Sequence, residues 1–204
     1  METRDEILLA ISPLFLRYGI KSITMDDIAK HLSISKKTIY LHFKDKDELV
    51  EEFVKVVDND HEHDMLKIKK EAVDVMDELT KISEFMRNKV CNINQSVLFD
   101  LKKYHPKAYM IFHHHKKNFM INFVLDTIKK GINEGYFRKN VNPEIFAILR
   151  LEQVEMSFNP DIFPPDKYNV NELHIQLFEH FIYGICTTEG FEKFMELRNS
   201  SAWK

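Results

Sequence analysis

The sequence predicts an all-α protein, and three observations support this fold class. Apolar residues recur at intervals of three and four along most of the chain, which is the spacing of one helical face. Only five Gly and six Pro occur among 204 residues, too few for the many tight turns of a hairpin-built β-protein. Ser, Thr and Asp stand just ahead of the apolar segments, where they favour helix N-termini.

The first helix is predicted near the N-terminus. Its apolar residues include Ile7, Ile11 and Phe15, and the pattern stops at Gly19. Pro13 lies inside this helix and has no backbone N–H, so we expect a local distortion there.

Two short helices follow, joined by a very short turn. Thr24 and Asp27 have the spacing of a near capping box and open the second helix. A turn is predicted at Ser33-Ile34, and Ser35 then caps a third helix over about 36–43. Short helices joined in this way form the helix-turn-helix layout.

A fourth helix begins with a second box, Asp45 and Glu48, and leads into the rest of the chain. We therefore predict a helix-turn-helix domain over 1–47 and a larger helical domain over 48–204. Further helices are predicted at 60–92, 96–104, 106–134, 143–157, 170–187 and 189–199. The Pro-containing segment 157–169 is predicted to be a loop.

The charge is unevenly distributed. The formal net charge is −3, yet the segment 30–46 has five lysines and one acid, Asp45. A basic segment on an acidic background is typical of a nucleic-acid contact, although most lysine clusters are only solvated helix faces. Charge alone leaves both interpretations open.

The third helix has the residue types that DNA recognition needs. Ile39 and Phe43 share one face and can pack inward, while long donors such as Lys37 lie on the other. Lysines reach guanine acceptors or phosphates, and a Thr or Leu methyl can contact a thymine methyl. Lys46 stands at the next helix start, where a phosphate can also meet free backbone N–H groups.

These segments together resemble the TetR family of bacterial transcription regulators. The resemblance is carried by Thr24-x-x-Asp27-Ile28-Ala29, by residues 34–43 and by Lys46-Asp47-Glu48-Leu49, and it covers about the first quarter of the chain. It implies an all-α homodimer with a C-terminal ligand-binding and dimerisation domain, and repression relieved by a ligand. Ser33 departs from the Gly that the family often has in the turn, and Pro13 is unusual in the first helix.

The resemblance also implies roles for individual residues. It implies that Tyr40, His42 and Lys46 contact phosphates, and that Lys36, Lys37, Thr38 and Leu41 contact bases. Thr24 and Ser35, the residues that open the second and third helices, complete the predicted DNA-binding set.

The helix predicted at 170–187 is apolar over a wide arc, so it is expected to bury two surfaces, its own core and a second subunit. A fully buried core helix is the alternative. The resemblance implies that this helix and the one before it, from Ile145 to Met156, form the dimer interface. The predicted interface residues are Leu149, Leu177, Phe178, Phe181 and Ile185.

A deformable interior rich in Phe and Met could hold an apolar or aromatic effector. The predicted ligand-binding residues, each of which could instead be core or surface, are Met86, Phe112, Phe119, Met120, Phe123, Glu152 and Met156. The His-rich segments 60–64 and 113–115 are expected to be polar surface, and no metal or other cofactor is predicted.

The predicted function is a DNA-binding regulator, a repressor released from a double-stranded operator by a small molecule. A regulator controlled by a protein partner is the alternative. No enzymatic activity is expected, because glycine-rich phosphate loops, nucleophile elbows and HExxH motifs are all missing from the sequence. With no signal peptide pattern, no membrane-spanning stretch and two isolated cysteines, the protein is expected in the cytoplasm, away from membranes.

Overall fold

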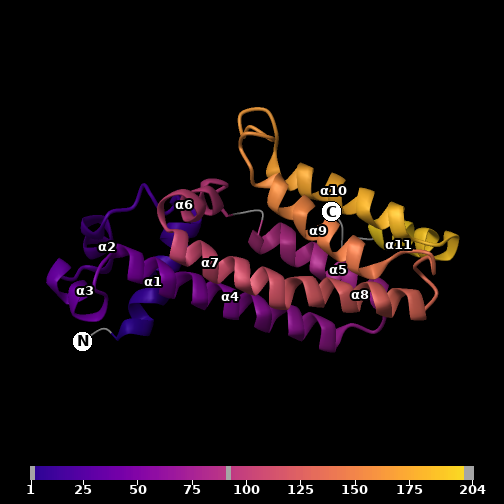
Figure 1. Ribbon diagram of the computed structural model, residues 1–204, viewed down its shortest axis with the longest axis horizontal. Coiled ribbons are helices and arrows are strands. Elements are labelled where there is room, and N and C mark those ends of the chain that lie inside the picture. The colour runs from indigo at the N-terminus through magenta and orange to yellow at the C-terminus, as the bar shows by residue number, and fades with distance from the viewer. Residues whose placement is uncertain (1–2, 91–92, 200–204) are drawn as a thin grey trace. The chain divides into compact units, whose positions relative to one another are not determined.

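The computed structural model describes residues 3–90 and 93–199 of the chain. Within these ranges the regular secondary structure is helical, apart from an isolated antiparallel bridge that joins Phe137 to Cys186 (Figure 1). The predicted all-α fold class is confirmed. None of the helices in the described ranges is both long and apolar enough to cross a membrane.

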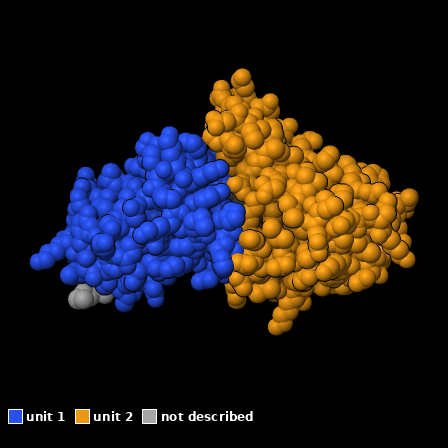
Figure 2. Space-filling view, in the orientation of Figure 1, with its two compact units in different colours: residues 1–61, 92–115 blue, residues 62–91, 116–204 orange. Residues whose placement is uncertain are grey.

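The chain forms two compact units (Figure 2). Unit 1 comprises residues 1–61 and 92–115, and unit 2 comprises residues 62–91 and 116–204. The predicted functional boundary after residue 47 falls inside a helix of unit 1, so the domain limits remain a prediction.

Unit 1 contains the short N-terminal helices. Its elements are α1 (Arg4–Tyr18), α2 (Met25–Leu32), α3 (Lys36–His42), the first part of α4 (Lys46–Glu71), α6 (Ser96–Tyr104) and α7 (Pro106–His115). The predicted first three helices are present at nearly the predicted bounds. Helix α1 continues through Pro13, and the carbonyl of Leu9 that loses its partner there belongs to an exposed residue, where water can satisfy it.

Unit 2 contains the remaining helices. These are the last part of α4, then α5 (Val75–Phe85), the π-helical turn η1 (Met86–Val90), a second π-helical turn η2 (Lys116–Met120), α8 (Ile121–Asn133), α9 (Pro143–Ser157), α10 (Val170–Ile185) and α11 (Thr188–Asn199). The loop predicted at 157–169 connects α9 to α10.

Two predicted boundaries are wrong. The structure has no break near residue 60, because α4 runs without interruption to Glu71. The break lies after it, where Asp74 accepts a hydrogen bond from the amide of Asp77 at 2.8 Å and so caps α5. The single helix predicted at 106–134 is divided by η2, a one-turn π-helical insertion that a 3.6-residue pattern does not reveal.

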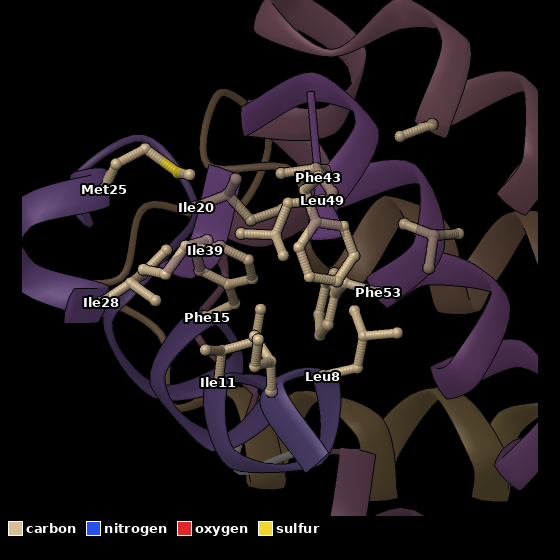
Figure 3. Close-up of a cluster of buried hydrophobic side chains, with 14 of the residues drawn as sticks. Leu8, Ile11, Phe15, Ile20, Met25, Ile28, Ile39, Phe43, Leu49 and Phe53 are labelled. Atoms are coloured by element: carbon tan, nitrogen blue, oxygen red, sulfur yellow. The ribbon is translucent and has the colours of Figure 1, made fainter. Parts of the chain in front are cut away.

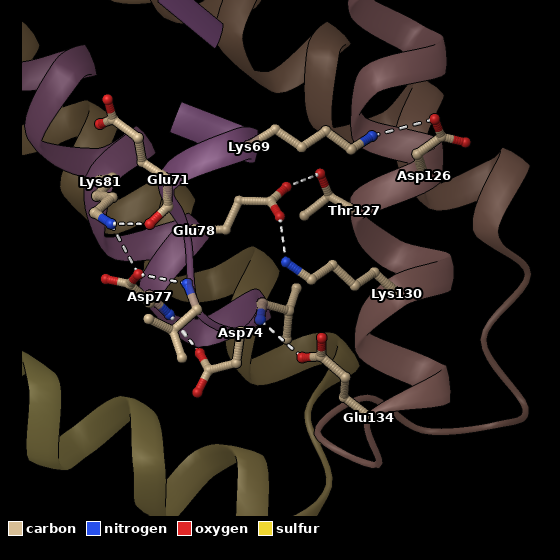
Figure 4. Close-up of polar contacts among 12 residues, drawn as sticks. Lys69, Glu71, Asp74, Asp77, Glu78, Lys81, Asp126, Thr127, Lys130 and Glu134 are labelled. Atoms are coloured by element: carbon tan, nitrogen blue, oxygen red, sulfur yellow. Dashed lines mark hydrogen bonds and ion pairs between the residues drawn. The ribbon is translucent and has the colours of Figure 1, made fainter. Parts of the chain in front are cut away.

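A satisfied polar network lies between α5 and α8 in unit 2 (Figure 4). The carboxylate of Glu78 is fully buried, and it accepts hydrogen bonds from Thr127 at 2.6 Å and from Lys130 at 2.9 Å. Glu134 accepts a further bond from the amide of Val75 at 2.8 Å. Because each partner is hydrogen-bonded, this buried charge is compensated within the protein.

Candidate DNA-binding surface

The core of unit 1 holds α3 by its apolar side (Figure 3). Ile39 is fully buried, and Phe43 directly after the helix is almost so. They belong to a cluster with Phe15 of α1 and Phe53 of α4, whose rings meet edge to face at 5.2 Å between centroids. Full burial of each such side chain contributes about 1.5–3 kcal/mol. The opposite face of α3 is thereby turned outward.

The caps of α2 and α3 form as predicted. Thr24 and Asp27 exchange two hydrogen bonds, amide to carboxylate at 2.9 Å and amide to hydroxyl at 3.2 Å. The hydrogen bonds from Thr24 hold the pKa of Asp27 below its ordinary value. Ser35 accepts from the amide of Thr38 at 3.0 Å and begins α3. Both caps place a hydroxyl residue at a helix N-terminus, where the sequence predicts DNA contacts.

The turn between α2 and α3 has a left-handed residue at its centre. Ser33 has φ +55°, and its amide and that of Ile34 donate to carbonyls in the last turn of α2. Glycine adopts this conformation without cost, whereas an L-residue pays about 1 kcal/mol for it. Ser33 therefore adopts a positive φ that a Gly would adopt more easily.

The outward face of α3 contains five of the predicted contact residues. Tyr40 and Leu41 expose 46% and 69% of their surface. Lys36 and Lys37 are exposed beside them. The ammonium of Lys36 pairs with a carboxylate oxygen of Asp26 at 2.9 Å, so it must share or leave this partner to reach DNA. Thr38, the fifth of these residues, is half-buried.

Two predicted phosphate contacts are less open. The Nζ of Lys46 donates to the carbonyl of Ile20 at 2.7 Å, and burial lowers the pKa of this lysine. His42 is half-buried, and its Nε2 is enclosed without a hydrogen-bond partner. Lys44, which sequence reasoning did not select, is exposed between them and is a further cation at this end of α3.

A carboxylate distant in sequence holds the loop between α1 and α2. The buried Oδ2 of Asp100 on α6 accepts hydrogen bonds from the amides of Ile20, at 3.0 Å, and Lys21, at 2.9 Å. Gly19 has φ +82° here, and a Cβ on it would come within 2.5 Å of the Ser96 hydroxyl. Sequence reasoning missed Asp100, because nothing local marks a residue whose partners lie about eighty positions away.

The structure separates the residues predicted to bind a ligand. Phe112 belongs to unit 1, where it packs against the core, whereas the other six belong to unit 2. Phe119 and Phe123 have neighbouring rings, 5.9 Å apart. Glu152 is exposed and pairs with Lys116 at 2.8 Å. Met86, Met120 and Met156 are half-buried.

The predicted dimer residues divide into two groups. Phe178, Phe181 and Ile185 lie in the core of unit 2, so their part in a subunit interface stays a prediction. Leu149 is exposed and Leu177 half-buried. Helix α10 has two apolar stripes, and the sequence alone does not show which of them faces the core of its own subunit.

Metal binding receives no support from the described residues. No three His, Cys, Asp or Glu side chains among them are grouped so that they could hold a metal ion. The rings of His61 and His115 lie side by side, with centroids 5.8 Å apart.

Comparisons with known proteins place this surface in context. Residues 7–53, which include all of α2 and α3, match the family described as bacterial regulatory proteins, tetR family. An uncharacterised helix-turn-helix regulator of Bacillus subtilis, YvaF, is 25% identical over 194 residues, covering 91% of this chain and 97% of that protein.

Two solved structures share the fold. A TetR-family regulator from Agrobacterium tumefaciens has a TM-score of 0.72 at 16% identity, covering 90% of this chain and 97% of its own. FadR of Bacillus subtilis, solved in complex with stearoyl-CoA, has a TM-score of 0.66 at 17% identity, covering 90% and 100%. The DNA-binding segment is therefore of the type found in the TetR family of bacterial transcription regulators, and the likeness to YvaF and to these folds extends over about nine tenths of the chain.

Proposed function

We propose that the protein is a homodimeric repressor, that α3 binds the major groove of a double-stranded operator, and that a small apolar or aromatic molecule releases it. The observation that carries the proposal is the division of α3 into two faces. Ile39 and Phe43 are enclosed in the core, whereas Lys37, Tyr40 and Leu41 lie open to solvent. A helix fixed by its apolar side and bearing long donors outward suits major-groove recognition.

The proposed contacts follow from exposure and chemistry. Base edges are contacted by Lys36, Lys37, Thr38 and Leu41, and phosphates by Tyr40, His42 and Lys46. Thr24 and Ser35 contact DNA from the starts of α2 and α3. Of these, Lys37 needs no rearrangement, since it is exposed and has no ion pair among the described residues. Lys46 must exchange the Ile20 carbonyl for a phosphate oxygen.

An operator selected from random duplex DNA tests this assignment. We expect Lys37→Ala to weaken binding of the selected duplex by about 5–150-fold, equivalent to about 1–3 kcal/mol. The matched control is Lys129→Ala, which removes an exposed lysine from α8 in unit 2 and should leave affinity unchanged. Equal affinities for wild type and Lys37→Ala would contradict the proposal that α3 reads the operator.

The proposed subunit interface is an exposed apolar stripe on α9. Ile145, Ile148 and Leu149 stand at positions i, i+3 and i+4, and each leaves more than two fifths of its surface exposed. On α10, Leu177 and Gly184 lie on the side away from the core. A second copy of the chain is the natural occupant, because a two-fold interface buries the same stripe twice and matches a palindromic operator.

Light scattering at micromolar concentration tests the interface. Ile148→Lys should convert a dimer into a monomer, because it places a charge in the centre of the buried stripe. Val73→Lys is the control, since Val73 is an even more exposed apolar residue in the loop between α4 and α5. A wild-type monomer, or an Ile148→Lys dimer of unchanged affinity, would refute the interface.

A ligand in unit 2 is supported by composition and by fold likeness. Six of the predicted pocket residues lie in this unit, and FadR, which has a similar fold, was solved with stearoyl-CoA, a molecule with a long apolar chain. Release requires that the ligand prefer the DNA-free state, and a coupling of about 1–3 kcal/mol weakens operator binding about 5–150-fold.

Native mass spectrometry of the purified protein distinguishes the two modes of control. A co-purified small molecule that lowers operator affinity when added back supports the effector. Loss of DNA binding only on addition of a second protein would replace it with partner control.

A further inference from the structure

Arg150 of α9 is a buried cation without a counter-ion. Only 7% of its surface is exposed, and no carboxylate in the described part of the chain lies within 4 Å of its guanidinium. Its Nη1 is enclosed and has no hydrogen-bond partner. The guanidinium instead lies near the rings of Phe178, at 5.2 Å, and Phe181, at 5.7 Å. Ring faces attract the charge, but they leave the N–H group unsatisfied.

Other buried charges in the described part of unit 2 lie beside an oppositely charged partner. Glu78 is paired with Lys130 (Figure 4), and 2.9 Å separates the carboxylate oxygen from the Nζ. The buried Glu179 is paired with Arg198 at 2.6 Å. An uncompensated charge is costly to bury, so its presence beside well-paired ones calls for an anion that the protein itself does not provide.

Two further buried polar atoms, on α9 and α10, are unsatisfied. The Nδ1 of His174 on α10 is buried without a partner, and so is the Oε1 of Gln153 on α9. The Ser157 hydroxyl donates to the Val154 carbonyl at 2.6 Å, so it accepts from Nε2 of His174 at 2.9 Å. In this tautomer Nδ1 has a free lone pair.

His174 also keeps this environment free of a second positive charge. Burial and the charge of Arg150 lower the pKa of His174 to about 4, so the imidazole is neutral at physiological pH. Arg150 itself stays charged there, although burial lowers its pKa to about 10. The cluster therefore combines one fixed cation with neutral hydrogen-bond acceptors and aromatic rings.

We propose that Arg150 is the anion-recognition residue of a ligand site between α9 and α10 in unit 2. The ligand is a small organic acid: its carboxylate pairs with the guanidinium, and its apolar body packs on phenylalanine rings. A carboxylate can take two parallel N–H bonds from one guanidinium, which satisfies Nη1 and neutralises the charge together. This inference names the chemical class of the effector, and only its regulatory consequence rests on the function proposed above.

Calorimetric titration of the DNA-free protein tests the site. The probes are straight-chain carboxylates from hexanoate to dodecanoate and 3-phenylpropanoate, each compared with its neutral amide. We expect at least one carboxylate to bind wild type, and its amide to bind at least tenfold more weakly. Arg150→Met should abolish that preference. Failure of every carboxylate to bind wild type, or equal binding to Arg150→Met, would overturn the proposal.

Thermal unfolding separates this role from a structural one. Without a probe, Arg150→Met should melt at the wild-type temperature or above it, because it removes an unpaired buried charge. Arg198→Met is the matched control: it strips Glu179 of its partner, so it should melt lower while its carboxylate affinity is retained. If Arg150→Met melts as low as Arg198→Met, or becomes monomeric in light scattering, Arg150 serves packing or a subunit contact instead.

The outcomes for the site and for the proposed function are distinguishable. A carboxylate that binds wild type but leaves the operator complex intact upholds the site and removes its role as effector. A neutral molecule that releases the operator equally from wild type and Arg150→Met upholds the effector and overturns the acid site.

Discussion

Asp100 offers a test of how a long-range contact supports the DNA-binding unit. We consider Asp100→Ala, which removes the carboxylate that accepts from the amides of Ile20 and Lys21. Hydrogen bonds to a charged group contribute about 1.5–3 kcal/mol each. The bond to Ile20 is buried, so its amide is left unsatisfied at a cost of about 2–3 kcal/mol, whereas water can replace much of the bond to Lys21. The expected loss is therefore about 3–4 kcal/mol.

Urea unfolding of the full chain, followed by circular dichroism, measures this loss as a lower midpoint at unchanged slope. Asp100→Asn keeps one acceptor oxygen and should lose about half as much. Asp126→Ala is the control, because its carboxylate is mostly exposed and makes only a surface pair with Lys69, a kind of contact that contributes about 0–1 kcal/mol. Equal midpoints for Asp100→Ala and Asp126→Ala would refute the reasoning.

Two further predictions concern stability. Ser33→Gly should stabilise the protein by about 0.5–1 kcal/mol, because glycine adopts the positive φ without strain. Ser35→Gly in the same turn is the control and should destabilise it by a few tenths of a kcal/mol. A lower urea midpoint for Ser33→Gly than for wild type would contradict this prediction. Burial raises the pKa of Asp58 from 3.8 to about 7, so its ionisation costs stability as pH rises from about 4 to 7. Asp58→Asn should therefore exceed wild type in stability at pH 8 by about 3–4 kcal/mol, with a gain that shrinks towards pH 4; a gain independent of pH in urea titrations would argue against a buried ionised carboxylate.

Local signals predicted the helix-turn-helix segment well, for a physical reason. A cap needs only residues three apart, as with Thr24 and Asp27, and an inward face needs only residues four apart, as with Ile39 and Phe43. The same kind of signal was overlooked at Asp74, where it stands among many other charged residues.

Signals at a distance were not readable in this way. Arg150 is a charged residue in a helix, a type that is almost always at the surface unless it is paired. Its burial depends on Phe178 and Phe181, which come from another helix. For the same reason the sequence does not show which side of α10 packs inward, because both stripes of that helix are apolar.

The sequence by itself determined the all-α class, the short N-terminal helices with their caps, and the outward side of α3, since each depends on contacts within one or two helical turns. Only the tertiary structure decided which side chains are buried, which charges are paired, and which carboxylate holds the loop after α1. These depend on contacts between segments that are far apart in the sequence. Because hydrophobic burial is non-directional and a core accepts many combinations of side chains, the sequence does not indicate which segments will pack together. The burial and the partners of Asp100 and Arg150 are therefore decided by tertiary packing.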